Sequence, residues 1–329
     1  MTDAETRSHK LIILMPVYND WEALSILLPR LERELTAYGM AAEILIVDDG
    51  STDSVPPNLG HKSFAAIESV DILSLRRNLG HQRAIAVGLS YIEAHRPCHA
   101  VVVMDGDGQD DPRDVPRLVE ECRANEGQKI IFAARIRRGE SLGFKFFYHL
   151  YRLIHFLLTG VKVRVGNFSV IPWPVLKRLV AVSELWNHYA AAVHKARLPM
   201  ALLPTQREKR LEGRSQMNLV GLVVHGLSAM AVFGDRIGVR LLIVVSLGMV
   251  LAGGALISVV GIRLLMNLAI PGWTAYLSGI LLVMLIQMLL LILVFAFVIL
   301  AARDTASFIP GRDYVYLIGE VHHVYGRSR

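Results

Sequence analysis

The chain has 329 residues, a formal net charge of +6, and hydrophobic residues at 53% of its positions. A basic balance of this kind is typical of proteins that bind nucleic acid, an anionic membrane surface or a phosphorylated substrate. The sequence contains no DNA- or RNA-binding motif, and its apolar excess is concentrated between residues 241 and 302. We therefore expect membrane and phosphate as partners, and no nucleic acid.

The first two-thirds of the chain alternates short apolar runs with stretches of helical spacing. We expect strands at residues 10–17, 43–47, 70–75, 100–104 and 129–133, and helices at 21–38, 84–94 and 115–125. Short apolar runs are typical of buried parallel strands. Strands that alternate with helices predict an α/β domain with a mostly parallel sheet.

Residues 143–158 have a helical pattern crowded with aromatic and basic side chains. That composition suits a helix lying in a membrane interface, and it equally suits a domain helix that packs its aromatic rings into a core. The sequence leaves both alternatives open.

Two long uncharged stretches follow, at residues 241–262 and 274–302. The first, at about 1.5 Å per residue, reaches about 33 Å, enough to cross a hydrocarbon core of about 30 Å. Residues 263–273 form the expected turn between two transmembrane helices. Gln287 lies inside the second stretch, and we expect its hydrogen-bond partner to come from another copy, in a homo-oligomer formed through these helices.

Basic residues are distributed unevenly around these stretches. The turn carries Arg263 alone, whereas Arg236, Arg240, Arg303 and Arg312 flank the outer ends. By the positive-inside rule, both outer ends are cytoplasmic. The polar N-terminus lacks the pattern of a signal peptide. We expect a multi-pass protein of the inner (plasma) membrane, with the catalytic domain and both termini in the cytoplasm.

These patterns predict four regions. They are a catalytic domain at 1–215, an amphipathic juxtamembrane segment at 216–240, two transmembrane helices at 241–302, and a cytoplasmic tail at 303–329. The tail contains the adjacent pair His322 and His323. An adjacent pair has poor geometry for holding one metal ion, so we expect a solvated tail there.

The strongest chemical motif is the acidic run from Asp105 to Pro112, directly after the strand expected at 100–104. Alternate side chains of an extended segment face the same way, so Asp105 and Asp107 can point together. Ligands of open α/β sheets bind at the carboxyl ends of the strands. Magnesium typically takes one or two protein carboxylates and completes its shell with water and substrate phosphates. The motif therefore predicts a divalent-metal site that stabilises a departing diphosphate.

Two more polar runs follow the first two expected strands, at residues 15–20 and 47–53. Each alone is an ordinary turn at the end of a strand. Together with the acidic run, they place polar groups at three strand ends, which predicts one shared crevice. Carboxylates there can accept hydrogen bonds from a base or a ribose, and Tyr18 can pack on a base.

These motifs carry a resemblance to glycosyltransferase family 2. It rests on residues 15–20, 47–53, 77–82 (Arg-Asn-Leu-Gly-His-Gln) and 105–112. With the two C-terminal stretches, the chain resembles the polyprenyl-phosphate glycosyltransferase branch, which includes dolichol-phosphate mannose synthases and bacterial undecaprenyl-phosphate sugar transferases. The resemblance implies a GT-A fold and inverting transfer of a single sugar from a UDP- or GDP-linked donor to a polyprenyl phosphate.

The resemblance also implies roles for individual residues. Nucleotide contacts are expected from Pro16, Tyr18, Asp20, Val47 and Asp49. Binding of Mg²⁺ or Mn²⁺ and of the diphosphate is expected from Asp105, Gly106, Asp107 and Gln109. Catalytic residues near the phosphates are expected to be Arg135 and Arg210, besides Asp107, with Ser215 in the same loop as Arg210. The lipid phosphate is expected at Lys145 and His149.

Two positions depart from the family's usual pattern. Gln216 stands where a lysine usually follows the loop serine, and Asn167 stands where an aspartate usually precedes the sixth strand. The first change removes a phosphate contact and the second removes a carboxylate near the sugar. The sugar of the donor is therefore left open.

No convincing general base is visible in the sequence, and a lipid phosphate acceptor needs none. The second pKa of a phosphate monoester is about 6, so the acceptor is already anionic near pH 7. It requires positioning and charge compensation rather than deprotonation.

Two other functions remain as alternatives. A processive polysaccharide synthase would share the N-terminal motifs, but such enzymes usually carry a Gln-x-x-Arg-Trp motif and more transmembrane helices than the sequence shows. A non-catalytic, membrane-anchored subunit that binds sugar nucleotides would tolerate the changes at Asn167 and Gln216. The intact acids Asp105 and Asp107 argue against it.

Overall fold

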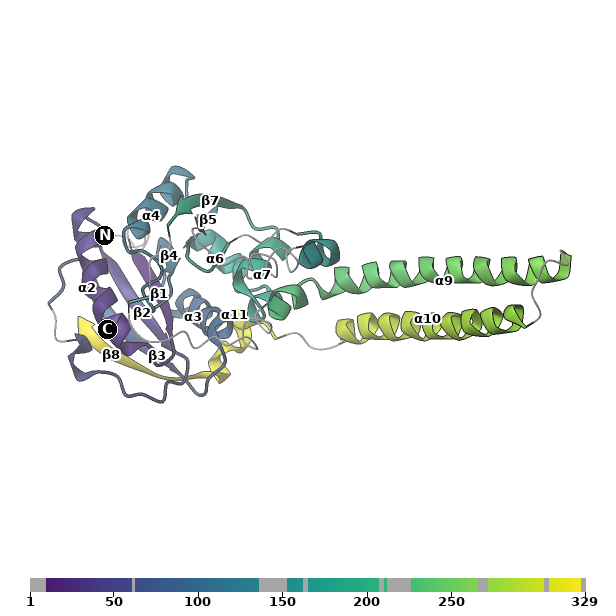
Figure 1. Ribbon diagram of the computed structural model, residues 1–329. Coiled ribbons are helices and arrows are strands. Elements are labelled where there is room, and N and C mark those ends of the chain that lie inside the picture. Colours follow the sequence, from purple (N-terminus) through teal and green to yellow (C-terminus); the bar gives the residue numbers. More distant parts are fainter. Residues whose placement is uncertain are drawn as a thin grey trace. The chain divides into compact units, whose positions relative to one another are not determined.

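The computed structural model describes residues 10–60, 63–135, 153–161, 165–206, 210–211, 226–265, 272–304 and 308–326 (Figure 1). The chain divides into two compact units. The first unit consists of Met1–Lys145, Val163–Val232 and Ser307–Arg329, and the second of Phe146–Lys162 and Phe233–Ala306. The expected site residues Lys145, His149 and Ser215 lie outside the described residues.

The first unit is built on an eight-stranded sheet with the order β7-β5-β6-β4-β1-β2-β3-β8. The strands are β1 (Leu11–Val17), β2 (Ala42–Asp48), β3 (Ile67–Leu75), β4 (Ala100–Val103), β5 (Ile130–Arg135), β6 (Ser169–Pro172), β7 (Met200–Thr205) and β8 (Ile318–Gly326). β1 pairs in parallel with β2 and β4, β2 with β3, and β5 with β7. β6 and β8 are antiparallel to their neighbours. The expected α/β domain with a mostly parallel sheet is confirmed.

Helices cover both faces of this sheet because its central strands are apolar on both sides. Along β1, Leu11, Ile13 and Met15 belong to the core shared with α2 (Trp21–Ala37) and α4 (Asp114–Ala124). Ile12 and Leu14 belong to the opposite core, shared with α3 (His81–His95), α6 (Trp173–Leu179) and α7 (Tyr189–Lys195). Short helical turns complete the unit, namely η1 (Pro57–Gly60), η2 (Ser183–Trp186), α11 (Pro310–Asp313) and η3 (Tyr314–Tyr316).

The C-terminal segment differs from the expected solvated tail. Residues Ile318–Gly326 form β8, which pairs antiparallel with the edge strand β3 and places His322 opposite Ile72 and His323 opposite Asp71. Phe64 N–H donates to Tyr325 Oη at 2.9 Å, which ties β8 to the loop before β3. The expected tail is wrong for these residues because an edge strand is paired on one side only and leaves most of its side chains exposed, so its pattern resembles that of a solvated segment.

His323 of β8 belongs to a polar cluster with Asp71 of the neighbouring strand β3. Its Nδ1 lies 2.7 Å from Asp71 Oδ1, and its Nε2 lies 2.9 Å from the carbonyl oxygen of Gly326. Arg96 Nη1 also contacts Asp71, at 2.7 Å. Because both partners of the imidazole are oxygen acceptors, both ring nitrogens must carry protons to satisfy them. The Gly326 carbonyl and Asp71 therefore raise the pKa of His323.

The second unit contains two long apolar helices, α9 (Gly234–Leu265) and α10 (Trp273–Asp304). Both are long and apolar enough to cross a membrane by length and composition. α9 begins before residue 241, so residues 234–240 of the expected juxtamembrane segment belong to this helix, while residues 216–225 lie outside the described part. Of the expected helix at 143–158, residues 153–158 are helical, and the helix continues to 159. Arg240 Nη1 donates to the carbonyl of Leu157 at 2.6 Å, near the end of that helix.

The imidazolium of His323 predicts a pH-dependent contribution to stability. A histidine whose pKa is raised on folding stabilises the fold fully below its unfolded pKa of about 6.5, and this contribution is lost as pH rises through the folded pKa. We expect wild type to have a higher melting temperature than His323→Gln at pH 6, with the gap narrowing toward pH 8.5. The control is His322→Gln, on the same strand. Thermal unfolding that shows an equal gap at all pH values would contradict the assignment.

Candidate active site

Acidic side chains from two strand ends meet at one arginine. Asp20 follows β1 and Asp107 follows β4, and these parallel neighbours end at the same edge of the sheet. Arg210 donates through Nη2 to Asp20 Oδ1, and through Nη1 to Asp107 Oδ2 at 3.4 Å. Arg210 is thus held beside two of the strand-end acids, and its expected role at the donor diphosphate stays a prediction.

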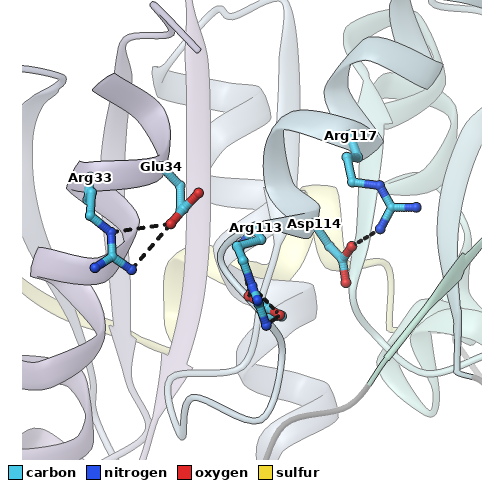
Figure 2. A network of polar contacts seen from close by, with 6 residues as sticks. Arg33, Glu34, Arg113, Asp114 and Arg117 are labelled. Carbon is cyan, nitrogen blue, oxygen red and sulfur yellow. Dashed lines mark hydrogen bonds and ion pairs between the residues drawn. The ribbon is translucent and has the colours of Figure 1, made fainter. Parts of the chain in front are cut away.

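The acids of the run after β4 form two groups. Asp110 and Asp111 are hydrogen-bonded to residues close in sequence, whereas Asp105 and Asp107 contact residues from distant parts of the chain. Asp110 accepts a hydrogen bond from Asp105 N–H at 3.2 Å. Asp111 accepts from Arg113 Nε at 2.9 Å. Figure 2 shows Arg113 and, on α4, the ion pair between Arg117 and Asp114, together with the Arg33–Glu34 pair on α2.

Asp105 and Asp107 contact residues brought in from elsewhere in the chain. Asp105 Oδ1 lies 3.2 Å from His81 Nε2 at the start of α3, and Asp107 contacts Arg210. Their side chains are 18% and 15% exposed, so water screens their charges only partly. These are the two carboxylates that the sequence singled out for a metal.

Glycines in the run after β4 allow close approach of other chain segments. A Cβ at Gly108 would lie 2.4 Å from the side chain of Leu211, and a Cβ at Gly106 would lie 2.9 Å from Val17 Cγ2. Leu211 N–H donates to the carbonyl of Asp107 at 3.2 Å. Residues 210–211 thus pack directly on the acidic run, which brings the guanidinium of Arg210 to it.

Asp49, after β2, holds the start of α3. Its Oδ1 accepts from Leu79 N–H at 2.6 Å and its Oδ2 from Gly80 N–H at 2.9 Å. Burial raises the pKa of Asp49, while these two hydrogen bonds oppose the shift. Gly50 has φ +71°, and a Cβ there would lie 2.7 Å from Asn78 N, so the two loops approach closely. Asp49 therefore positions His81, which follows Gly80 in the chain.

Asn19 joins the ends of β1 and β2, a role that the sequence did not reveal. Its Oδ1 accepts from Thr52 N–H at 2.9 Å and from Asp53 N–H at 3.1 Å. Its backbone has φ +56°, which asparagine tolerates better than most residues. Such a left-handed residue cannot be identified from a strand-end turn pattern alone.

His81 is a second residue whose role the sequence did not reveal, although it lies in the Arg-Asn-Leu-Gly-His-Gln motif. Partial burial lowers the pKa of His81, but the carboxylates of Asp105, Asp107 and Asp49 raise it more, so the net shift is upward. The imidazole is therefore sensitive to any cation that neutralises these acids.

The remaining expected residues differ in how far they can reach a ligand. Pro16 and Val47 are buried, and Val47 packs in the core beside Gly88, so any nucleotide contact would come from their main chain. Tyr18 is half-buried. Gln109 N–H donates to Asp107 Oδ1 at 3.0 Å, which shapes the turn. Arg135 ends β5, and its side chain is outside the described atoms.

The donor set fits a hard divalent cation that shares its shell with a ligand. Among the described residues, no three histidine, cysteine, aspartate or glutamate side chains group together as a complete metal cage. Magnesium does not need such a cage, since it is usually held by one or two carboxylates plus substrate phosphates and water. Asp105 and Asp107, with the carbonyl group of Gln109 nearby in sequence, provide oxygen ligands of this type.

Comparison with known proteins decides the family. The model of the family described as "Glycosyl transferase family 2" matches residues 12–176, half of the chain. The chain belongs to this family. The resemblance inferred from the strand-end motifs is thereby confirmed, and the matched region includes Asp20, Asp49, Asp105 and Asp107.

Curated relatives share part of this region. The undecaprenyl-phosphate 4-deoxy-4-formamido-L-arabinose transferases of Salmonella paratyphi B and Salmonella newport are each 34% identical over 133 residues. The match covers 40% of this glycosyltransferase chain and 39% of each relative. It therefore spans about two-fifths of the relatives' length.

Solved structures show the same fold at low sequence identity. Mannosyl-3-phosphoglycerate synthase from Rubrobacter xylanophilus aligns with a TM-score of 0.51 and 15% identity, over 70% of this chain and 75% of that one. Glucosyl-3-phosphoglycerate synthase from Mycobacterium tuberculosis, in complex with Mn²⁺ and UDP-glucose, aligns with a TM-score of 0.50 and 15% identity. The alignment covers 72% of this chain and 82% of that one. The expected GT-A type of α/β fold is confirmed.

The position of Arg210 predicts a role in binding a diphosphate. We expect Arg210→Ala to weaken the binding of UDP or GDP in the presence of Mn²⁺ by roughly tenfold or more, because a hydrogen bond to a charged group is worth about 1.5–3 kcal/mol. The nucleotide affinity of Arg210→Lys should lie between those of wild type and Arg210→Ala, since lysine keeps the charge but loses the bidentate fork.

Isothermal titration calorimetry measures this effect directly. The control is Arg312→Ala, which removes an exposed arginine that pairs with Asp313 away from the strand ends. Unchanged nucleotide affinity in Arg210→Ala would remove Arg210 from the site.

Proposed function

We propose that the protein transfers a single sugar, with inversion, from a UDP- or GDP-linked donor to a polyprenyl phosphate at the cytoplasmic face of the inner membrane. One observation carries the proposal: Asp105 and Asp107 lie at the carboxyl edge of the sheet, with Arg210 bridging Asp107 to Asp20. The presence of two apolar helices in the same chain supports a lipid-linked acceptor.

The acidic pair would bind Mg²⁺ or Mn²⁺ together with the donor diphosphate. Support comes from the Mycobacterium tuberculosis synthase of similar fold, whose structure holds Mn²⁺ and UDP-glucose. When bound, the ion would neutralise charge that develops on the diphosphate as the sugar bond breaks. Asp105 and Asp107 would hold it, with Gln109 beside them.

Arg210 would exchange carboxylate partners for phosphate partners. A guanidinium binds phosphate and carboxylate through the same planar fork. When a metal ion neutralises Asp107, its attraction for Arg210 falls, and the diphosphate becomes the stronger partner. We assign the other phosphate contacts to Arg135 and Ser215, and the nucleotide contacts to Pro16, Tyr18, Asp20, Val47 and Asp49.

The acceptor assignment rests on the relatives and on phosphate chemistry. The Salmonella proteins are named as undecaprenyl-phosphate transferases. A lipid monophosphate is already anionic near neutral pH, so its oxygen can attack the anomeric carbon without a general base. Lys145 and His149 would position that phosphate and compensate its charge.

Chain connectivity supports an even number of membrane crossings. The first unit contains residues both before α9 and after α10, and β8 pairs with β3 within it. A folded domain lies on one side of a membrane, so the chain that leaves it must return to the same side. The distribution of Arg236, Arg240 and Arg312 around the helices supports a cytoplasmic location for that side.

Association of copies would involve the face of α10 that carries Gln287. This residue lines a shallow groove with Tyr276, Gly279 and Val283. An amide exposed to hydrocarbon gains from a hydrogen-bond partner, and we assign that partner to a second copy of the chain.

Removal of one metal-binding carboxylate tests the proposed reaction. We expect Asp107→Asn to lower metal-dependent transfer of labelled sugar into the organic phase by on the order of a hundredfold or more, since each 1.36 kcal/mol of lost stabilisation is tenfold in rate. The assay uses the full chain in detergent, a panel of UDP- and GDP-sugars, Mg²⁺ or Mn²⁺, and polyprenyl phosphate.

The matched control is Asp114→Asn, on α4, where the carboxylate pairs with Arg117. Burial raises the pKa of Asp114, so a neutral side chain is tolerated there better than at an exposed site. Normal transfer in Asp107→Asn would contradict the metal assignment. Donor binding without transfer or hydrolysis in wild type would indicate a non-catalytic subunit, and polymeric product would indicate a processive synthase.

A further inference from the structure

An arginine near the start of α3 packs on aromatic rings from two distant segments. The Cζ atom of Arg83 lies over the ring of Trp186, on η2, at 5.0 Å from its centroid. Trp186 packs in turn against Phe308, with ring centroids 4.1 Å apart and planes inclined at 35°. All three side chains are half-buried. We call Arg83, Trp186 and Phe308 the Arg83 stack.

The charge of Arg83 is not paired with an acid. Among the residues that the structure describes, none makes a hydrogen bond or an ion pair with its side chain. The acid of η2, Glu184, contacts Lys195 at 3.9 Å instead. Arg83 also lies in the first turn of α3, where the positive end of the helix dipole disfavours a cation. Stabilisation of α3 therefore does not explain a cation at this position.

The aromatic contact leaves the hydrogen-bonding edge of Arg83 available. A guanidinium lies on a ring through its flat face, while its five N–H donors point outward in its own plane. Packing on Trp186 therefore restricts the orientation of that plane without using any donor. A guanidinium held in this way can bind a phosphate through two parallel hydrogen bonds. The Arg83 stack thus has the chemistry of a phosphate-binding group.

Two connections along the chain relate this group to the acidic site and to the membrane. His81, two residues before Arg83, lies 3.2 Å from Asp105. Phe308 follows the last residue of α10 by four residues, which limits the separation of their Cα atoms to about 14 Å. A lipid headgroup has to pass from the membrane to the donor, whereas the donor diphosphate is already assigned to Arg210. The acceptor phosphate is therefore the anion that suits the stack.

We propose that Arg83 binds the phosphate of the polyprenyl acceptor, and that Trp186 and Phe308 are positioning residues that fix the plane of its guanidinium. The proposal rests on the proposed function, since it takes a lipid phosphate as the acceptor. An anionic phosphate requires charge compensation and orientation rather than deprotonation. Arg83 supplies both, in addition to the contacts assigned to Lys145 and His149.

A comparison of polyprenyl phosphate with the uncharged polyprenol of the same length isolates the phosphate contact. Native mass spectrometry of the full chain in detergent micelles measures both affinities without turnover. We expect wild type to bind the phosphate more tightly than the alcohol. We expect Arg83→Gln to lose roughly tenfold or more of its affinity for polyprenyl phosphate, as for a lost hydrogen bond to a charged group. Its affinity for polyprenol should be unchanged.

The matched control is Arg33→Gln, which removes the same charge from an exposed arginine of α2 that pairs with Glu34. It should keep both affinities. If Arg83→Gln does not fold, Arg83→Lys supplies the comparison, with an intermediate affinity for the phosphate, because lysine keeps the charge but lacks the fork.

Variants of Trp186 test the positioning role. We expect Trp186→Leu to weaken the binding of polyprenyl phosphate and not that of polyprenol. Trp186→Phe should restore it, because a phenyl ring also attracts a guanidinium through its face. An unchanged affinity for polyprenyl phosphate in Trp186→Leu would reject the positioning role of the ring.

Two results for Arg83→Gln would overturn the assignment of the acceptor phosphate to Arg83 while leaving the proposed function in place. One is an unchanged affinity for polyprenyl phosphate in a wild-type background that prefers it to polyprenol. The other is an equal loss of affinity for the phosphate and the alcohol, which would indicate a structural role.

Titration with UDP or GDP and Mn²⁺ separates the acceptor from the donor. We expect Arg83→Gln to keep the nucleotide affinity of wild type. Weaker nucleotide binding with unchanged binding of polyprenyl phosphate would assign Arg83 to the donor and reject the proposal. A wild-type protein that does not distinguish polyprenyl phosphate from polyprenol would reject the lipid phosphate acceptor of the proposed function, and the role of Arg83 with it.

Discussion

Accumulated negative charge at one sheet edge is the constraint on which the site depends. Parallel pairing of β1 and β4 forces Asp20 and Asp107 to the same edge, where both reach Arg210. Like charges held close together in a partly desolvated place repel unless a cation compensates them. Arg210 supplies that compensation from a segment about 100 residues away from Asp107, and a divalent ion with its phosphate ligands would do so in a working complex.

Several side chains around these acids are held by main-chain N–H groups. Asp49 binds the N–H groups that begin α3, Asn19 binds those of the loop after β2, and Gln82 binds the N–H of Tyr189. Side chains that are fixed by backbone donors keep one orientation. Preorganisation of this kind lets a site hold a cation and a diphosphate without rearranging its own dipoles during the reaction.

The features that depended on local pattern could be predicted, and those that depended on distant partners could not. The apolar runs that became β1, β2 and β4, and hence the placement of Asp105 and Asp107, follow from hydrophobicity and strand-end position. Strand β8 could not be predicted in this way, because this edge strand is defined by its pairing with β3 and not by its own sequence pattern. The contact between Asn167 and His81 joins residues 86 positions apart, and no local spacing encodes it.

The most direct test of the central claim is an anomalous-scattering crystal structure with Mn²⁺ and UDP or GDP. We expect an ion bonded to a carboxylate oxygen of Asp105 or Asp107 and to the diphosphate, with the Arg210 guanidinium moved from Asp107 onto a phosphate oxygen. An ion bound elsewhere, or a nucleotide diphosphate that contacts neither the ion nor Arg210, would contradict it.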